Sequence, residues 1–350
     1  MLNLLENARP LHMDELGMAS AGEWDAFVRS RNEGTFCHLY GWRSIMEELL
    51  GHEVRYLAAR NEDCAIVGVL PLVRVRSRLF GDYMVSMPFL NDGGPIGDPD
   101  AVRFLAGHAE ALARRSGVDL LELRSRNDIP GDLETSDRKV TVLLDLPEDP
   151  EVLWKGFRSK VRSQIRRPLK EGMETRIGID QILPFYDVYA RHMRDLGTPV
   201  LPLAFFLRAL HLFEDHLVLA AVYHEGEPVA AGAGFVHGDE FEITWAAALR
   251  EHNRLAPNML LYWRLMEEMC RRGLKTFNFG RCTPGGGTHR FKLQWGGYDL
   301  PLPWAQWSPR SLDATPSPDA ARYRLATRAW QNLPLVVTNR LGPWLARRIP

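Results

Sequence analysis

Two stretches of this chain follow the same pattern, in which an apolar segment, a polar turn and a second apolar segment succeed one another. Residues 57–73 read LAARNEDCAIVGVLPLV, residues 219–236 read LAAVYHEGEPVAAGAGFV, and the two align with one gap. Apolar runs of this length around a short polar turn predict antiparallel β-hairpins. The repetition therefore predicts a chain with two halves built on one plan.

The residues after each hairpin extend the parallel between the halves. A further strand, a helix and another strand are expected at 83–87, 101–115 and 120–124 in the first half and at 241–247, 259–272 and 276–279 in the second. Strands that pair as hairpins before a helix follows predict a mixed, mostly antiparallel sheet flanked by helices. The expected fold class is α/β (α+β), with two domains of this kind.

The length and the changes of composition along the chain set the expected domain boundaries. A chain of 350 residues has room for two domains and a tail. The Pro-Glu-Asp-Pro segment at 147–150 marks a linker, so the domains are expected at 1–148 and 151–305. Residues 306–350 are expected to form a Pro- and Ser-rich loop and then a basic, helical, amphipathic tail, which has no acidic residue after Ala320.

Composition excludes several classes of protein. A net charge of -1 argues against a surface that is basic all over, and four scattered cysteines offer no zinc site and no disulfide framework. No metal is therefore expected. The amino terminus lacks the pattern of a signal peptide, and no apolar run reaches the roughly 20 residues of a membrane span. The expected location is the cytoplasm.

The segment 276–296, TFNFGRCTPGGGTHRFKLQWG, carries the strongest chemical signal. An apolar strand delivers Arg281, three glycines (Gly285, Gly286 and Gly287) form a flexible loop, and Arg290 and Lys292 follow. Glycines let a backbone approach a bulky ligand, and the cations hold phosphates or stabilise a developing oxyanion. The alternative is an ordinary strand-loop-strand connection with solvated charges.

The segment 155–170, KGFRSKVRSQIRRPLK, predicts a basic amphipathic helix. Arg158, Arg162 and Arg166 recur every four residues beside an apolar stripe, and Lys160 adds to the charge. Like charges at this spacing repel, so an anionic partner such as a diphosphate or an RNA backbone would relieve them. A solvated helix face is the alternative.

Three further candidates lie outside these two segments. Asn258 lies at the start of the helix expected at 259–272, where free backbone amides attract anions, although it is also simply a good helix-start residue. Trp245 is a candidate to line a substrate cleft, and His192 is a weaker one, since both residue types are more often core residues.

Several common catalytic signatures are missing from the sequence. It contains no G-x-S-x-G elbow, no P-loop and no H-E-x-x-H motif. The R/Q-x-x-G-x-G/A loop that many acetyl-coenzyme A enzymes use for the pyrophosphate is also missing. Serine-hydrolase, P-loop nucleotide-hydrolysing and zinc-peptidase chemistry are therefore not expected.

The motifs taken together resemble the FemAB-like proteins, a branch of the GNAT acyltransferase superfamily, and among them the subgroup associated with exosortase/PEP-CTERM exopolysaccharide systems. The matching segments are 157–172, 186–200, 245–263 and 277–296. The resemblance implies two tandem GNAT-like domains with a substrate cleft between them. It also places Lys292 where a cation stabilises the tetrahedral oxyanion, and Arg158, Lys160 and Arg162 near a diphosphate or the acyl donor.

The resemblance implies an acyl- or aminoacyltransferase that acts on an amine of a sugar- or lipid-linked cell-envelope precursor, related to peptidoglycan or exopolysaccharide. The donor is an acyl-coenzyme A or an aminoacyl-tRNA, with no tightly bound cofactor. The coiled-coil arm linked with tRNA handling is missing, so tRNA is not favoured as a partner. Asp299 and Glu242 are candidates for the general base.

Three other interpretations stay open. The protein is alternatively an N-acetyltransferase that uses acetyl-coenzyme A, a non-catalytic scaffold of an exopolysaccharide or exosortase system, or an RNA-binding module. The arginines and tryptophans of residues 320–350 suggest in addition a peripheral contact with the inner face of the cytoplasmic membrane.

Overall fold

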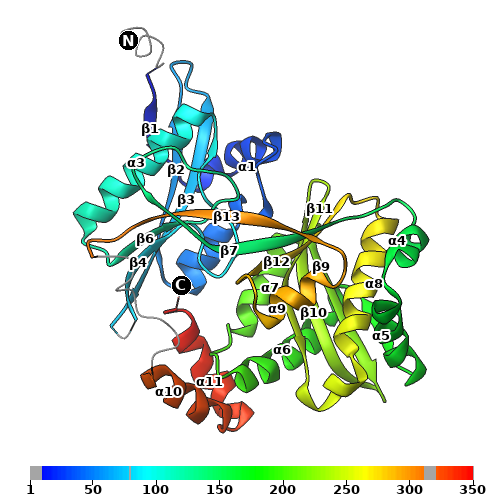
Figure 1. Cartoon of the computed structure of the whole chain (residues 1–350). Coiled ribbons are helices and arrows are strands. Elements are labelled where there is room, and N and C mark those ends of the chain that lie inside the picture. Colours follow the sequence, from blue (N-terminus) through cyan, green and yellow to red (C-terminus); the bar gives the residue numbers. More distant parts are fainter. Residues whose placement is uncertain (1–9, 79, 311–320, 350) are drawn as a thin grey trace. The chain divides into compact units, whose positions relative to one another are not determined.

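The computed structural model describes residues 10–78, 80–310 and 321–349, with the side chains of 321–324 left aside (Figure 1). Its contacts divide the chain into two compact units. Unit 1 comprises residues 1–139, 301–315 and 348–350, and unit 2 comprises residues 140–300 and 316–347. No helix within the described ranges combines the length and the apolar character that crossing a membrane requires.

Unit 1 contains a mostly antiparallel sheet that follows the hairpin predicted at 57–73. Its strands, in spatial order, are β1 (His12–Glu15), β2 (Glu53–Arg60), β3 (Ile66–Ser77), β4 (Gly81–Val85) and β6 (Leu120–Leu123), and the short β5 (Ile96–Gly97) pairs with β3. Only β4 and β6 pair in parallel. Its helices are α1 (Ala21–Ser30), α2 (Trp42–Ser44) and α3 (Pro99–Ser116), and α3 buries Leu105 and Ala109 against the sheet.

Unit 2 repeats this arrangement and adds more helices. Its strands, in spatial order, are β7 (Glu134–Asp145), β12 (Thr276–Cys282), β11 (Glu240–Ala248), β10 (Glu227–His237), β9 (Leu217–His224) and β8 (Glu174–Ile177). Its helices are α4 (Pro150–Gly156), α5 (Ser159–Lys170), α6 (Ile182–Leu196), α7 (Leu203–Leu212), α8 (Pro257–Arg271), α9 (Gly287–Leu293), α10 (Ala321–Gln331) and α11 (Leu335–Ala346).

The predicted duplication is confirmed at the level of connectivity. Unit 1 runs β2-β3-β4-α3-β6 and unit 2 runs β9-β10-β11-α8-β12, with two antiparallel pairings followed by a helix and a parallel pairing in each. The mixed, mostly antiparallel fold class is therefore correct. The helical character of the tail is also confirmed by α10 and α11.

Two long strands carry the chain from one unit into the other. Residues 140–145 of β7 belong to unit 2 and pair with β12, whereas residues 301–307 of β13 (Tyr298–Trp307) belong to unit 1, where β13 pairs with β6. The division falls inside these strands. At the predicted linker, Asp149 instead accepts a hydrogen bond from the Glu151 amide and caps α4.

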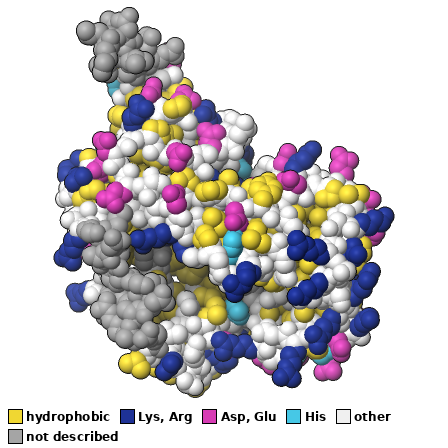
Figure 2. Space-filling model, in the orientation of Figure 1, with side chains coloured by type: hydrophobic (Ala, Val, Ile, Leu, Met, Phe, Trp, Pro, Cys, Tyr) yellow, Lys and Arg dark blue, Asp and Glu magenta, His cyan; other side chains and the backbone are white. Residues whose placement is uncertain are grey.

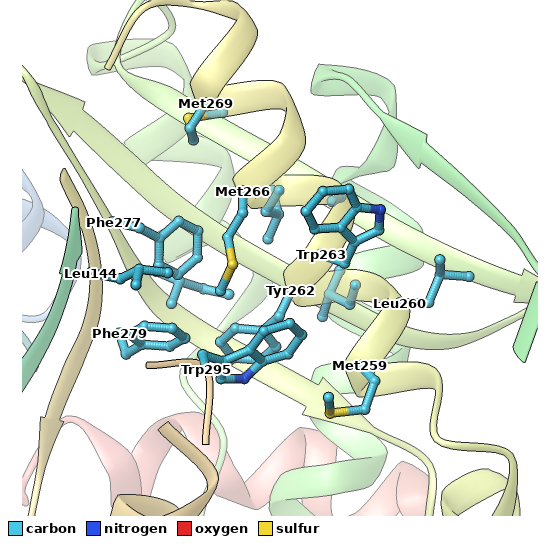
Figure 3. Packing of buried hydrophobic residues seen from close by; sticks show 14 of the residues in the cluster. Leu144, Met259, Leu260, Tyr262, Trp263, Met266, Met269, Phe277, Phe279 and Trp295 are labelled. Atoms are coloured by element: carbon cyan, nitrogen blue, oxygen red, sulfur yellow. The ribbon is translucent and has the colours of Figure 1, made fainter. Parts of the chain in front are cut away.

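The core of unit 2 surrounds α8, whose buried residues repeat at helical spacing (Figure 3). Tyr262 stacks on Phe279 with ring centroids 5.8 Å apart, and Trp295 from the segment after α9 lies 6.2 Å from Tyr262. Aromatic side chains of this size bury large apolar areas and pack in fixed relative orientations. The core therefore fixes α8 and α9 against β12.

The predicted basic helix at 155–170 is wrong at its start. Helix α4 ends at Gly156 and α5 begins at Ser159, so Phe157 and Arg158 have extended backbone between them. Phe157 packs against Trp263 and Trp295, and this contact requires the chain to turn there. A second prediction, a loop from Ser308 to Asp319, lies mostly outside the described residues.

Candidate active site

The two parallel strands of unit 2 stay paired only at their beginning. Glu240, Phe241 and Glu242 of β11 pair with residues 276–278 of β12, and beyond them no register joins the described parts of these strands. Strand β12 turns at Gly280, which has a φ of +70°, and its register with β7, its other neighbour, shifts there between Asn278 and Arg281. A parallel pair that separates in this way leaves backbone groups open for other partners.

Lys292 supplies such a partner from α9. Its Nζ donates to the carbonyl oxygens of Gly280 and Arg281 at 2.5 and 2.9 Å. The side chain is 4% exposed, which is rare for a lysine. An ammonium group carries three hydrogens, so two are directed at the carbonyls of β12 and one remains for a further acceptor.

Burial changes the protonation of this lysine. Desolvation lowers the pKa of Lys292 to about 8 from its ordinary 10.5 and outweighs the opposing attraction of Cys282 and Glu242. A lysine in this state is still mostly protonated at neutral pH. Its charge is held in a fixed place, where burial leaves little water to weaken its interactions.

A buried polar network lies at the point where β11 and β12 part. Asn278 is 1% exposed, and its amide nitrogen donates to Glu240 at 2.9 Å and to Glu242 at 3.2 Å. Its oxygen accepts from the Thr141 hydroxyl at 2.5 Å and from the Gly280 amide at 2.8 Å. The network fixes the turn at Gly280 and with it the carbonyl that Lys292 contacts. No sequence motif pointed to Asn278 or Thr141, which are 137 residues apart.

The glycine-rich segment forms a shorter loop than predicted. Helix α9 starts at Gly287, so Gly287 belongs to the helix and only Gly285 and Gly286 precede it. The Gly285 amide donates to His289 Nδ1 at 3.0 Å, and its carbonyl accepts from Arg290 at 2.7 Å. Two side chains of α9 thus hold the backbone of the loop. The predicted flexibility is limited by contacts from four and five residues further along the chain.

His289 was not among the residues selected from the sequence, yet it contacts both this loop and Asp299. Its Nε2 lies 2.9 Å from Asp299 Oδ1, while its Nδ1 accepts the hydrogen from Gly285. The Nε2 atom therefore carries the proton that faces the carboxylate. Asp299, a candidate general base, is engaged in positioning His289.

A cavity of about 200 Å³ opens beside α9 and the start of α8. Its lining comprises Gln164, Asn253, Ala256, Pro257, Asn258, Met259, Phe291 and Gln294. Among the described atoms, neither Gln164 Oε1 nor Asn258 Oδ1, both buried, has a hydrogen-bond partner. Helix α8 begins with Pro257, which has no amide hydrogen, and it has no side-chain cap, while its Met259 amide donates to the Ala256 carbonyl at 3.0 Å. The cavity thus combines polar side chains with a helix amino terminus.

The basic face of α5 lies next to this cavity, which Gln164 of the same helix lines. Arg158, Lys160 and Arg166 are exposed, and Figure 2 shows Lys and Arg side chains gathered over this part of unit 2. Arg162 differs, because it donates to the carbonyls of Lys155 and Phe157 at 3.0 and 2.8 Å. Arg162 therefore holds the end of α4 in place.

The remaining predicted residues are not brought to the lysine or the cavity. Trp245 is 8% exposed and packs edge-on against Phe206 of α7 and against Phe235, with centroids 5.2 and 6.0 Å away. His192 shares a hydrogen bond of 3.1 Å with the Ala248 carbonyl, and burial lowers its pKa. The contacts that the structure gives these two residues are those of core side chains.

Comparison with known proteins supports this reading of unit 2. Residues 155–293 match the family model described as an acetyltransferase (GNAT) domain. That range contains α5, the cavity, the separating strands and Lys292. No curated protein is similar enough in sequence to be matched to the chain.

Solved structures with the same fold cover most of the chain. FemX is 14% identical with a TM-score of 0.64, and 85% of this chain covers 97% of it. The carboxyl-terminal domain of a putative lysylphosphatidylglycerol synthetase from Agrobacterium fabrum is 12% identical with a TM-score of 0.57, over 85% and 93%. A tandem GNAT protein from the clavulanic acid biosynthesis pathway is 13% identical with a TM-score of 0.52, over 85% and 98%.

These findings define the class of protein. Residues 155–293 carry a GNAT domain, the domain of an acyltransferase. The fold as a whole is the one seen in FemX and in a tandem GNAT protein, which is the fold that the FemAB-like resemblance predicted. The association with exosortase systems stays a prediction.

Proposed function

We propose that the protein transfers an acyl or aminoacyl group to an amine of a sugar- or lipid-linked precursor of the cell envelope. The observation that carries the proposal is the buried ammonium of Lys292 at the point where β11 and β12 separate. A fixed positive charge at a gap between strands suits a reaction in which a carbonyl oxygen becomes negative.

The proposed chemistry assigns one role to each charged group. The amine nitrogen attacks the carbonyl carbon, the C–N bond forms, and the oxygen of the tetrahedral intermediate accepts the remaining hydrogen of Lys292. Arg281, whose carbonyl Lys292 also contacts, and Arg290, which holds the glycine loop, add positive charge. The donor's sulfur or oxygen then leaves with the proton that the amine loses. Buried Glu242 and exposed Asp299 are the two candidates to relay that proton.

The donor is proposed to lie at the cavity between α5, α8 and α9. The amino terminus of α8 and the buried oxygens of Asn258 and Gln164 offer hydrogen-bonding groups, and the exposed Arg158, Lys160 and Arg166 suit the phosphates of an acyl donor. Both a coenzyme A thioester and the ester of an aminoacyl-tRNA carry such phosphates. The experiment below distinguishes the thioester from the aminoacyl-tRNA ester.

The name of one structural neighbour supports an envelope-related acceptor. It is a domain of a putative synthetase of lysylphosphatidylglycerol, whose name describes an aminoacylated membrane lipid. On this proposal the enzyme works at the inner face of the cytoplasmic membrane. The enzyme meets its lipid- or sugar-linked precursor at that face of the membrane.

A substitution of the lysine tests the proposal. Lys292→Ala is expected to lower turnover by two to three orders of magnitude, because removing one oxyanion donor costs about 2.7–4 kcal/mol. The test supplies radiolabelled donors in turn: acetyl-coenzyme A, longer acyl-coenzyme A species and aminoacyl-tRNA. Membrane extract provides the acceptor, and the radiolabel transferred to it is measured.

Lys275→Ala is the matched control, since Lys275 is exposed and lies before β12. The assignment of Lys292 fails if its alanine variant, with an unchanged melting temperature, transfers as fast as the Lys275 variant. Absence of transfer by the wild type from every donor would favour the scaffold interpretation instead.

An N-acetyltransferase that uses acetyl-coenzyme A is the second candidate, because the family model is described as an acetyltransferase domain. It predicts that acetyl-coenzyme A alone raises the melting temperature, and that Asn258→Leu, which fills the cavity with an apolar side chain, abolishes the shift. Aminoacyl-tRNA would give no shift in that case.

A further inference from the structure

Helix α11 has one face that packs into unit 2. Thr338, Gly342 and Ala346 recur every four residues and are buried. A Cβ on Gly342 would lie 3.0 Å from the Val200 nitrogen, so the helix approaches the chain after α6 closely. Gln331 at the end of α10 donates to the Asp195 carbonyl of α6 at 3.0 Å. Both helices are therefore fixed on α6.

The opposite face of α11 is apolar as well. Val336 is 79% exposed and Trp344 50% exposed, and they lie eight residues apart on that face, with Arg340 midway between them. Leu341, beside this face, and Leu325 of α10 are also exposed. Large apolar side chains gathered on one exposed helix surface mark an interaction site more often than isolated ones do.

The charge of this surface has a single sign. Arg328 of α10 and Arg340 of α11 are exposed, Arg347 follows α11, and the range 325–349 contains no aspartate or glutamate. Helix α8, in contrast, carries an acidic partner for its arginine, since Arg271 pairs with Glu267 at 2.7 Å. The arginines of α10 and α11 have no acidic residue on their own helix.

We propose that the outer face of α11, with Leu325 and Arg328 of α10, binds the surface of an anionic lipid bilayer. Apolar side chains would enter the headgroup region, the Trp344 indole would lie at that level, and the arginines would meet lipid phosphates. A second copy of this chain is a poorer occupant, because two identical arginine-bearing faces repel. The inference goes beyond the proposed reaction and does not rest on it.

Vesicle flotation of the full-length protein tests the inference. The wild type is expected to float with vesicles of phosphatidylcholine and phosphatidylglycerol at low salt, and not with phosphatidylcholine alone. Arg340→Glu changes the local charge by two, so its partition coefficient should fall about thirtyfold at roughly 1 kcal/mol per charge. Val336→Ser with Leu341→Ser should lower it at least about tenfold.

Matched variants elsewhere on the surface serve as controls. Val152→Ser on α4, where Val152 is 57% exposed, and Arg115→Glu in the last turn of α3 should float like the wild type. Equal flotation of the α11 variants and these controls would overturn the proposal and place lipid binding on another surface. A wild type that does not float, or a dimer in light scattering that the α11 variants dissociate, would overturn it as well.

Discussion

At the scale of the residue, Lys292 owes its properties to its surroundings. The sequence identifies a lysine after a glycine-rich segment, and the structure buries it between two backbone carbonyls and beside the network of Asn278. Solvated lysines titrate near 10.5, whereas burial brings the pKa of this one to about 8. The chemistry proposed for it depends on that fixed and desolvated charge.

The lowered pKa predicts how stability changes with pH. Between pH about 8 and 10.5 the unfolded chain still binds a proton at Lys292 that the native protein has released, so the wild type gains stability as pH rises through this range. The gain is about 3 kcal/mol, at 1.36 kcal/mol per pKa unit. Urea unfolding of the wild type and Lys292→Met at several pH values would measure it. A constant difference between the two proteins across pH 7 to 11 contradicts the assignment.

At the scale of the element, the loop before α9 is held by backbone geometry and by its own helix. Gly285 has a φ of +76°, and its amide and carbonyl bond to His289 and Arg290. Gly287, two residues later, begins the helix and has no positive φ. Two glycines of the same short segment thus have different structural requirements, which the sequence does not distinguish.

Two alanine substitutions separate those requirements. A Cβ added at Gly285 or at Gly287 would have no described atom within 4 Å, so neither alanine would clash with its surroundings. Gly285→Ala is expected to destabilise the protein by about 1 kcal/mol, the cost of a left-handed conformation for a residue with a side chain. Gly287→Ala is expected to be neutral or slightly stabilising because alanine favours helices. Equal melting temperatures of the two variants would contradict the loop geometry.

At the scale of the whole molecule, the division between the two units falls inside strands. Residues 140–145 of β7 belong to the continuous stretch of unit 2, and residues 305–307 pair with β6 in unit 1. Unit 1 therefore includes a segment that follows the main stretch of unit 2 in the chain. The domains expected at 1–148 and 151–305 remain a proposal, which separate expression of the two fragments can test.

Fragments with different boundaries make the test. Residues 151–305 lack β7, the strand that pairs with β12. This fragment is therefore expected to aggregate or to give poorly dispersed amide resonances. Residues 140–347 retain that strand, α10 and α11, and are expected to give dispersed resonances and a cooperative thermal transition. Cooperative folding of 151–305 by itself would show that β7 is dispensable.

Local patterns in the sequence determined much of the fold. Both hairpins, α3, α8 and the parallel strands after them follow from apolar periodicity and turn residues, which act over a few neighbouring positions. The apolar stripe of Val161 and Ile165 likewise predicted α5, although the break at Phe157 came from packing against Trp263. The residue types of the glycine-rich segment suggested acyl-transfer chemistry.

Only the tertiary structure decided where that chemistry is placed. The separation of β11 from β12, the pairing of Thr141 with Asn278 and the cavity formed by Gln164 with Phe291 all join residues far apart in the chain. Contacts between residues far apart in the chain leave no periodic pattern in the sequence. The sequence also does not distinguish a buried lysine or arginine from a solvated one. The sequence alone determined the elements and the charged residues available, whereas packing decided that Lys292 is buried, that Arg162 caps α4 and that the face of α11 stays exposed.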